Sequence, residues 1–445
     1  MRKKSILILT VAALCAFTAG TAAITKREAK ANTLPENTTV DMYLLAGQSN
    51  AVGYSPKWAL NQTFENVWYA GEVNRKLDGT NANATLGDHT TYVNVTAGLG
   101  RDNSCIGPEY GMSEVLNDLY AGTDRKAMIV KSAAGGTNLS DNSGGENANF
   151  GNWYPRSLWT AVNADPANNA ATDPTGVQYY NFVENFKTVY TELKTEGYTP
   201  VVKGMVWMQG CSDVGGVSNY DELLKTLISD VRSDIFAVTG READRTVPFI
   251  IGEIPVGINP SAKVPAFNEL QRKAASESEE AYTVATDGLE IGSDGWHFTS
   301  SSAEELGKRF GKRLTETIKS DIDFYVRGAS VRAVDDEYGP GIKFHVVMGK
   351  ADYDALKEKG NLRTGTLICP AAKLGTWETL TVETAAAKDI DTTDAWRETQ
   401  IDGVSVMESV VYVYDIPASN YGSDLYAVGY YCEGEGDARY SRRIA

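Results

Sequence analysis

Hydrophobic positions follow two alternating patterns between about residues 40 and 320. Short apolar runs are typical of buried strands, and stretches with three- and four-residue apolar spacing are typical of amphipathic helices. The expected strands are Val40–Ala46, Ala127–Lys131, Val201–Met208, Val247–Gly252 and Ala281–Ala285. The expected helices are Tyr110–Tyr120, Tyr179–Thr195, Tyr220–Val238, Val264–Glu277 and Ser301–Lys319. Alternating units of this kind predict an α/β fold with a parallel sheet between layers of helices.

Two long stretches rich in Asn, Gly, Thr and Asp interrupt this alternation, Asn61–Asp102 and Ser140–Asp173. We expect both to be loops, which on a rigid sheet often carry binding residues. Several aromatic residues fall in or beside them: Trp58, Trp68, Trp153, Tyr154 and Trp159. Their rings either stack on sugars or pin the loops to the body of the protein.

The pattern changes after about residue 322. Short alternating or apolar spans separated by turn residues predict a C-terminal β-sandwich over residues 322–445. Only Ala351–Lys359 has the spacing of a helix, and that helix is short. This region resembles the accessory β-domains of large exported bacterial surface proteins, which implies a possible cell-surface association.

The N-terminus has the features of a secretory signal peptide. Three basic residues precede the uncharged apolar stretch Ile6–Ile24, and Ala29-Lys30-Ala31 matches a cleavage site. An uncleaved membrane anchor is the alternative, because the apolar stretch is almost long enough to span. We therefore expect residues 1–31 to be a signal peptide, residues 32–321 one domain and residues 322–445 a second. The expected location is extracellular or at the surface of a bacterial cell.

Charge and cysteine usage exclude some partners. Cleavage after residue 31 removes six basic residues and one acidic residue, so the net charge changes from −16 to −16 − 5 = −21. Such a chain opposes binding to nucleic acid. The four remaining cysteines, Cys105, Cys211, Cys369 and Cys432, match no zinc pattern. Cys369 and Cys432 either form a disulfide or remain free.

Four segments carry candidate chemistry, and three of them directly follow an expected strand. These are Gly47–Asn50, Ala133–Thr137 and Trp207–Asp213, and the fourth is the loop Asp294–His297. A serine hydroxyl becomes nucleophilic when an imidazole takes its proton and a carboxylate orients that imidazole. The segments therefore suggest a serine hydrolase with its nucleophile near the start of the chain and its acid–base pair near the end.

An oxyanion hole is expected from the same segments. The backbone N–H groups of Ser49 and of Gly135 or Gly136, with the Gln209 carboxamide, can donate to a developing oxyanion. Gln48 and Asn50 flank the serine, and Trp153 lies in a predicted loop, so these three are the candidate substrate-binding residues. Taken alone, the segment Gly47–Asn50 is better explained as a helix N-cap with Ser49 as the capping residue. His89 and His345 are expected to be structural.

Together the four segments resemble the SGNH hydrolases. Within that superfamily they are most similar to the branch of the sialate O-acetylesterases and the acetylxylan esterases of carbohydrate esterase family 6. The matching blocks are Gly47–Asn50, Gly135–Thr137, Trp207–Asp213 and Asp294–His297, supported by Ile106–Gly111. The resemblance implies a flavodoxin-like three-layer α/β/α sandwich that removes acetyl groups from carbohydrate without metal or organic cofactor. It also implies Ser49 as nucleophile, His297 as general base and then acid, and Asp294 as its orienter.

One position departs from the family pattern. Cys211 stands where the family has a glutamate that in some relatives helps to hold the histidine, so that support would fall to Asp294. The expected function is a secreted esterase acting on acetylated xylan or O-acetylated sialic acid. Alternatives are a catalytically weakened carbohydrate-binding or adhesive surface protein, an acetyltransferase on the same core, and Cys211 as a replacement nucleophile.

Overall fold

The computed structural model describes residues 38–77, 92–141, 149–159, 174–216, 218–258, 261–318, 323–332, 339–374, 379–401, 404–420 and 422–443. The predicted signal peptide, residues 1–31, and the histidine His89 lie outside these ranges. No helix within them combines the length and the hydropathy that a membrane span requires.

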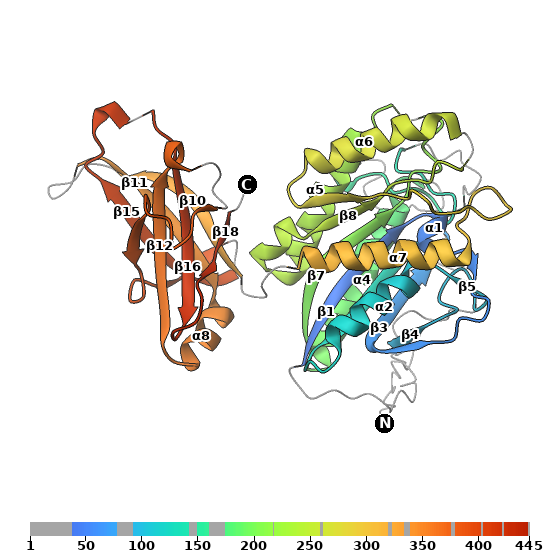
Figure 1. Ribbon diagram of the computed structural model, residues 1–445, viewed down its shortest axis with the longest axis horizontal. Helices are drawn as coiled ribbons and strands as arrows, with labels where there is room; N and C mark the ends of the chain where they lie inside the picture. The colour runs from blue at the N-terminus through green and yellow to red at the C-terminus, as the bar shows by residue number, and fades with distance from the viewer. Residues whose placement is uncertain are drawn as a thin grey trace, which may run out of the picture. The chain divides into compact units, whose positions relative to one another are not determined.

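The expected parallel sheet has seven strands in the order β4-β3-β6-β1-β7-β8-β9 (Figure 1). All neighbours are parallel except β3 and β4. The strands are β1 (Thr39–Gly47), β3 (Thr63–Val73), β4 (Val93–Thr96), β6 (Lys126–Ala133), β7 (Thr199–Met208), β8 (Phe249–Gly252) and β9 (Ala281–Val284). β1 lies in the middle of the sheet and is buried along almost its whole length, as its continuous apolar run predicts.

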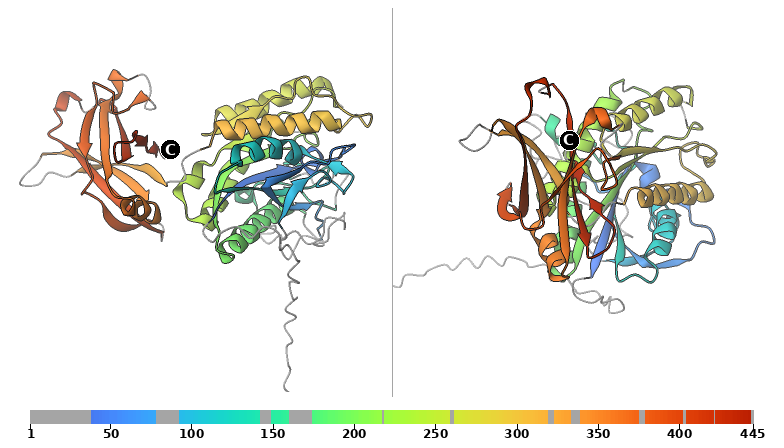
Figure 2. Two further views of the ribbon diagram at one scale, coloured as in Figure 1. Left: turned by 60° about the horizontal axis from the view of Figure 1, so that its bottom comes forward. Right: turned by 60° about the vertical axis from the view of Figure 1, so that its left-hand side comes forward.

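Helices cover both faces of this sheet. They are α1 (Ser49–Val52), α2 (Pro108–Tyr120), α4 (Val177–Thr195), α5 (Tyr220–Thr239), α6 (Val264–Ser276) and α7 (Ser300–Glu316). In the left-hand view of Figure 2, α2 and α7 lie on one side of the sheet and α4 on the other. The helices α2 and α7 approach closely because Gly111 and Gly307 face each other's backbone, where any added Cβ would overlap a carbonyl oxygen. This arrangement is the predicted α/β/α sandwich.

The strands and helices predicted in this region are confirmed, with ends that shift by a few residues. The prediction that Asn61–Asp102 is a loop is wrong, because β3 and β4 lie within it. Trp68 on β3 is only 4% exposed and packs against Tyr92 and Tyr198, so it anchors this segment to the body. A small antiparallel pair is formed by β2 (Ser55–Pro56), which follows α1 directly in sequence, and β5 (Cys105–Ile106). Gly53, the residue after α1, lies against Ile106 and Gly107.

The C-terminal region is β-rich, as predicted. One sheet has the order β14-β15-β11-β10-β18 and the other β13-β12-β16-β17. The strands are β10 (Phe324–Arg332), β11 (Gly341–Gly349), β12 (Leu362–Pro370), β13 (Lys388–Asp391), β14 (Arg397–Ile401), β15 (Val404–Tyr414), β16 (Leu425–Glu433), β17 (Arg439–Tyr440) and β18 (Arg442–Arg443). Phe344 and Val411 from the first sheet pack with Ile368 from the second. The predicted short helix is present as α8 (Lys350–Glu358).

The disulfide considered between Cys369 and Cys432 does not form. Both thiols are free and buried. In the antiparallel pair of β12 and β16, Cys369 lies opposite Tyr426 and Cys432 lies opposite Arg363. The two cysteines therefore lie at opposite ends of the strand pair, too far apart for a disulfide.

Candidate active site

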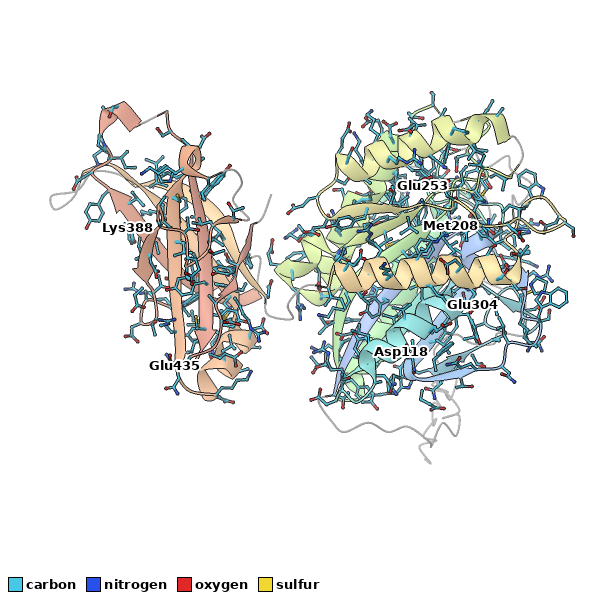
Figure 3. All side chains as sticks on the ribbon, viewed as in Figure 1. Asp118, Met208, Glu253, Glu304, Lys388 and Glu435 are labelled. Atoms are coloured by element: carbon cyan, nitrogen blue, oxygen red, sulfur yellow. The ribbon has the colours of Figure 1, made fainter. Side chains whose placement is uncertain are left out.

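Three strand ends meet at one level of the sheet. Gly47, the last residue of β1, pairs with Ala133 at the end of β6 and with Met208 at the end of β7. The ladder continues one residue further on both sides, since Gln48 N–H donates to Met208 O (3.0 Å) and Ala134 N–H donates to Gly47 O (3.1 Å). Figure 3 labels Met208 inside the α/β part of the molecule. Three of the four predicted segments are thus neighbours at the carboxyl edge of the sheet.

Gly47 makes the turn from β1 into α1 possible. Its φ of +143° is rarely adopted by residues with a side chain, and a Cβ here would overlap the carbonyl oxygen of Met208. The chain then enters α1, whose first residue is the half-buried Ser49. Within the described residues, neither the Ser49 hydroxyl nor its backbone N–H has a hydrogen-bond partner. Both groups are therefore available to an incoming molecule.

Asp294 orients His297 within one tight loop. Its Oδ1 accepts the backbone N–H groups of Trp296 (2.9 Å) and His297 (3.0 Å), and its Oδ2 lies 2.7 Å from His297 Nδ1. Partial burial raises the pKa of the Asp294 carboxyl, but these bonds and the nearby imidazole outweigh burial and leave the pKa lowered. An ionised carboxylate at Nδ1 leaves Nε2 as the nitrogen that can accept a proton.

Asn50 connects the serine segment to the histidine loop. Its Nδ2 donates to Trp296 O (3.2 Å) and its Oδ1 accepts the Phe298 N–H (3.4 Å). The residue after Ser49 is therefore bonded to both neighbours of His297. No hydrogen bond joins the Ser49 hydroxyl to the His297 ring among the residues that the structure describes. Asn50 is 4% exposed and fully engaged, so it positions the site, whereas the sequence predicted a substrate contact.

Gln48, the residue before Ser49, is also bonded to a distant segment of the chain. Its Oε1 accepts the N–H groups of Gly210 (3.0 Å) and Ser212 (3.2 Å), and its Nε2 donates to the Ser212 hydroxyl (3.3 Å). The side chain is buried and holds the segment after β7 against α1. All of its polar atoms are bonded to the protein, and the role of Gln48 in substrate binding stays a prediction.

Two of the predicted oxyanion donors are already occupied. The Gly135 N–H donates to Asn74 Oδ1 (2.8 Å). Gln209 Nε2 donates to Thr137 O (3.0 Å) and to Asp213 Oδ2 (2.6 Å), which uses both amide hydrogens of a fully buried side chain. Both groups are engaged within the protein in this arrangement, and their place in the oxyanion hole stays a prediction.

Gly136 offers the remaining predicted donor. Its backbone is partly exposed, and its N–H has no hydrogen-bond partner among the described residues. Together with the Ser49 N–H, it leaves two unengaged donors on adjacent strand ends. Oxyanion holes in acyl transfer commonly use backbone N–H groups of this kind.

Trp153 is a core residue. Only 1% of its surface is exposed, its Nε1 donates to the Thr137 hydroxyl (2.9 Å), and its ring packs edge-on against Trp207 at 5.0 Å. A side chain buried to this extent presents no open face to a sugar in this arrangement, and the role of Trp153 in substrate binding stays a prediction. The residue instead supports the loop that contains Gly136.

Asp213 ties that same loop to the end of β7. It accepts the Leu139 N–H (2.9 Å), the Ser140 N–H (3.3 Å) and the Ser140 hydroxyl (3.0 Å), in addition to the Gln209 amide. Burial raises its pKa, while these donors act in the opposite direction. The expected structural role of Asp213 agrees with these contacts.

Cys211 takes the place of the family glutamate without taking over its chemistry. Burial raises the pKa of the Cys211 thiol to about 12, and the thiol is hydrogen-bonded to the Asn50 side chain. A protonated thiol is a poor nucleophile, which argues against Cys211 as a replacement for Ser49. The support of His297 thus comes from Asp294 and Asn50.

Sequence reasoning missed an aromatic contact on the histidine. The Tyr54 ring stacks on His297 with centroids 4.5 Å apart and an interplanar angle of 11°, and the Arg101 guanidinium lies 5.0 Å from the Tyr54 centroid. Burial raises the pKa of Tyr54, while a hydrogen bond from the Asn74 side chain acts in the opposite direction. Asn74 also accepts the Gly135 N–H, so it links the glycine loop to the histidine. No local motif marks Tyr54 or Asn74 in the sequence.

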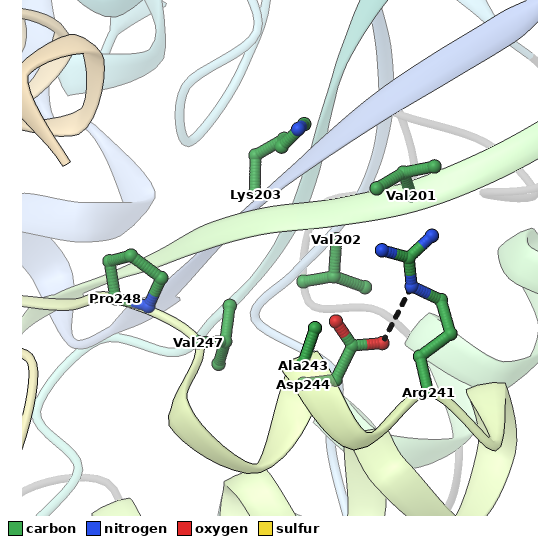
Figure 4. A pocket seen from close by; sticks show the side chains of 8 residues that line it. All are labelled: Val201, Val202, Lys203, Arg241, Ala243, Asp244, Val247 and Pro248. Carbon is green, nitrogen blue, oxygen red and sulfur yellow. Dashed lines mark ion pairs between the residues drawn. The ribbon is translucent and has the colours of Figure 1, made fainter. Parts of the chain in front are cut away.

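A separate pocket lies at the other edge of the sheet. It is lined by Val201, Val202, Lys203, Arg241, Ala243, Asp244, Val247 and Pro248 (Figure 4). Val201–Lys203 belong to the amino-terminal half of β7, whereas the candidate site follows its carboxyl end. No group of three metal-ligating side chains gathers anywhere in the described ranges.

Known proteins provide an independent comparison. The family described as "carbohydrate esterase, sialic acid-specific acetylesterase" matches residues 39–316, which is more than half of the chain. The chain belongs to this family. It is therefore a carbohydrate acetylesterase, a carboxylic ester hydrolase. No curated protein matches the chain by sequence.

Several solved structures are distantly similar to this chain. NanS is 13% identical, with a TM-score of 0.44 over 64% of this chain and 98% of its own. A protein from Arabidopsis thaliana is 16% identical, with a TM-score of 0.40 over 64% and 100% of the two chains. A carbohydrate acetylesterase from Xanthomonas citri is 14% identical, with a TM-score of 0.40 over 90% and 78%. These likenesses are too low to bear on the site itself.

Proposed function

We propose that this carbohydrate esterase uses Ser49 as nucleophile, His297 as general base and acid, and Asp294 as the group that orients His297. The observation that carries the proposal is the pair of hydrogen bonds between the Asn50 side chain and the residues on either side of His297, one donated to Trp296 O and one accepted from the Phe298 N–H. It joins the serine segment to an imidazole whose Nδ1 is already held by a carboxylate. Catalytic hydrogen bonds often tighten only when substrate binds, which suits a Ser49 hydroxyl that is unengaged here.

The chemistry follows from these positions. Ser49 Oγ attacks the acetyl carbonyl carbon while His297 Nε2 accepts the hydroxyl proton. The sugar oxygen then leaves with that proton, and water hydrolyses the acetyl-enzyme by the reverse transfer. The N–H groups of Ser49 and Gly136 are the proposed oxyanion donors, since both lack other partners in the described chain.

The proposed substrate is an O-acetylated sialic acid, and acetylated xylan is the competing candidate. The family description favours the first. Export to the cell exterior, and surface association through the C-terminal domain, are further parts of the proposal. They are supported by the N-terminal sequence pattern and by a second β-rich region outside the family match.

The nucleophile is tested with Ser49→Ala on p-nitrophenyl acetate. The matched control is Ser330→Ala in the C-terminal sheet. There the hydroxyl also lies against a histidine, with Ser330 Oγ 3.1 Å from His345 Nε2 and His345 Nδ1 3.0 Å from Glu408 Oε1. We expect Ser49→Ala to lose activity and Ser330→Ala to keep it. Equal background rates for the wild type and Ser49→Ala would instead favour a carbohydrate-binding protein without activity.

The substrate is tested by acetate release from two materials. O-acetylated mucin sialic acid and acetylated xylan are incubated with equal amounts of the wild type and of Ser49→Ala. We expect Ser49-dependent release from the sialic acid. Faster acetate release from xylan would show that acetylated xylan is the preferred substrate and overturn the proposal of sialic acid.

A further inference from the structure

A fully buried ion pair lies beneath the nucleophile helix, and the reaction steps above do not use it. Lys131 on β6 and Glu109 on α2 are 0% and 1% exposed, and Lys131 Nζ lies 2.7 Å from Glu109 Oε2. Lys131 Nζ also donates to Val52 O (2.7 Å) and Leu99 O (3.3 Å), so all three of its hydrogens are engaged. Glu109 Oε1 accepts the Gly107 N–H (2.8 Å).

The pair holds a helix that is too short to hold itself. α1 has four residues, fewer than an isolated helix needs to be stable. Val52 is its last residue, and the Lys131 ammonium at the Val52 carbonyl places a positive charge at the negative end of the helix. Ser49 is at the other end of this single turn, so a shift of its last carbonyl moves the hydroxyl.

The same pair connects α1 to helix α2, which packs on α7, the helix that follows the histidine loop. Glu109 is the second residue of α2, where a negative charge suits the positive end of the helix. α2 packs closely on α7 through Gly111 and Gly307. The histidine loop runs directly into α7, whose N-cap is Thr299. The Lys131–Glu109 pair thus fixes α1 relative to α2. Because α2 packs on α7, and α7 follows the histidine loop, the pair also fixes α1 relative to His297.

We propose that the Lys131–Glu109 pair is a positioning device that sets the Ser49 hydroxyl in register with His297. Buried ion pairs contribute little net stability compared with apolar residues of similar volume. A device for placing the nucleophile therefore explains the pair better than a device for stability. This inference rests on Ser49 being the nucleophile.

The test is the double variant Lys131→Met with Glu109→Gln, which removes both charges and keeps the volumes. We expect kcat on p-nitrophenyl acetate to fall about 10- to 100-fold, as for small misplacements of reacting groups, with KM changed less than about 2-fold. The rate of Ser49 labelling by a fluorophosphonate should fall in parallel. The Val52 and Leu99 carbonyls lose their donor in this variant, so we expect a melting temperature lower by roughly 5–10 °C, and both rates are measured well below it.

The matched control is Lys308→Met with Glu114→Gln. That pair joins the same helices, α7 and α2, at 3.0 Å but is about one-third exposed on each side. We expect it to leave kcat and the labelling rate unchanged. If the first double variant does not fold, Glu109→Asp keeps both charges and shortens the carboxylate by one methylene, and it should also slow labelling.

The possible failures are distinguishable. A folded Lys131→Met/Glu109→Gln variant that labels at the wild-type rate overturns the positioning role and leaves the nucleophile intact. Equal slowing in the Lys308→Met/Glu114→Gln control overturns it as well, because the effect would then be general. A wild-type protein that is never labelled at Ser49 overturns the proposed nucleophile itself.

Discussion

Asp294 makes three hydrogen bonds within four residues of chain, and their division between its two oxygens orients the imidazole. Oδ1 is occupied by backbone N–H groups, so Oδ2 alone faces Nδ1. Other side chains near the site are distinguished in the same way by their partners. Gln48, Asn50 and Gln209 have polar atoms bonded within the protein, whereas Ser49 and Gly136 retain unengaged donors in the described chain.

Replacing the Asp294 carboxylate by an amide should keep the fold intact and greatly slow the reaction. In Asp294→Asn, the amide nitrogen can face Nδ1 and favour the tautomer with the proton on Nε2, which cannot accept the serine proton. We expect kcat for acetyl ester hydrolysis to fall about 10²- to 10⁴-fold. An unchanged kcat would show that another group orients His297.

The Cys211 thiol should be inert under ordinary conditions. Its pKa is raised to about 12, so the thiol is protonated at neutral pH and little thiolate exists at pH 8. We expect iodoacetamide at pH 8 to leave activity intact while the native protein remains unmodified at Cys211. Peptide mass spectrometry checks the site, with urea-unfolded protein as the control that alkylates. Rapid loss of activity with modification at Cys211 would contradict this expectation.

At the scale of elements, loops are held by single buried side chains. Asp213 receives donors from the loop after β6 and from Gln209 at the end of β7. Sequence reasoning placed both loops beside Ser49 correctly, because carboxyl ends of adjacent parallel strands share an edge. It did not foresee that Gln209 and Trp153 are buried, because burial and hydrogen-bond partners come from residues far away in the chain. It missed β3, because Asn66, Glu65 and Gly71 weaken the apolar pattern of a strand that is largely buried.

Removing the Asp213 anchor should destabilise the protein measurably. Asp213→Ala leaves two loop N–H groups and the Gln209 amide without their acceptor in a buried region. We expect a loss of about 3 kcal/mol in unfolding free energy and a melting temperature lower by roughly 5–10 °C. Asp118→Ala is the control, since Asp118 is exposed on α2 and should cost under about 0.5 kcal/mol. Differential scanning calorimetry measures both.

At the scale of the whole molecule, the sequence predicted an α/β part followed by a β-rich C-terminal part, and both are present. The α/β part and the β-rich C-terminal part have separate cores, formed by different sets of residues. The boundaries at residues 31 and 321 stay predictions, because the flanking residues lie outside the described ranges. Strong periodicity made the layers predictable, whereas loop contacts such as Tyr54 with His297 depend on the assembled fold.

Export can be checked on the full chain. We expect expression in a secreting bacterial host to release a protein that begins at Asn32, since Ala29-Lys30-Ala31 is the expected cleavage site. N-terminal sequencing of the medium and of the membrane fraction measures this. An intact N-terminus in the membrane fraction would favour the anchor alternative.

The stacking of Tyr54 on His297 provides the site with a built-in spectroscopic reporter. An imidazole 4.5 Å above a phenol ring lies in its ring-current cone, so its carbon-bound protons resonate upfield of ordinary histidine signals. The chain has only three histidines, so a single displaced resonance is assignable without a full NMR assignment. Titrating that resonance would follow the ionisation of His297, the proposed general base, directly in the resting enzyme.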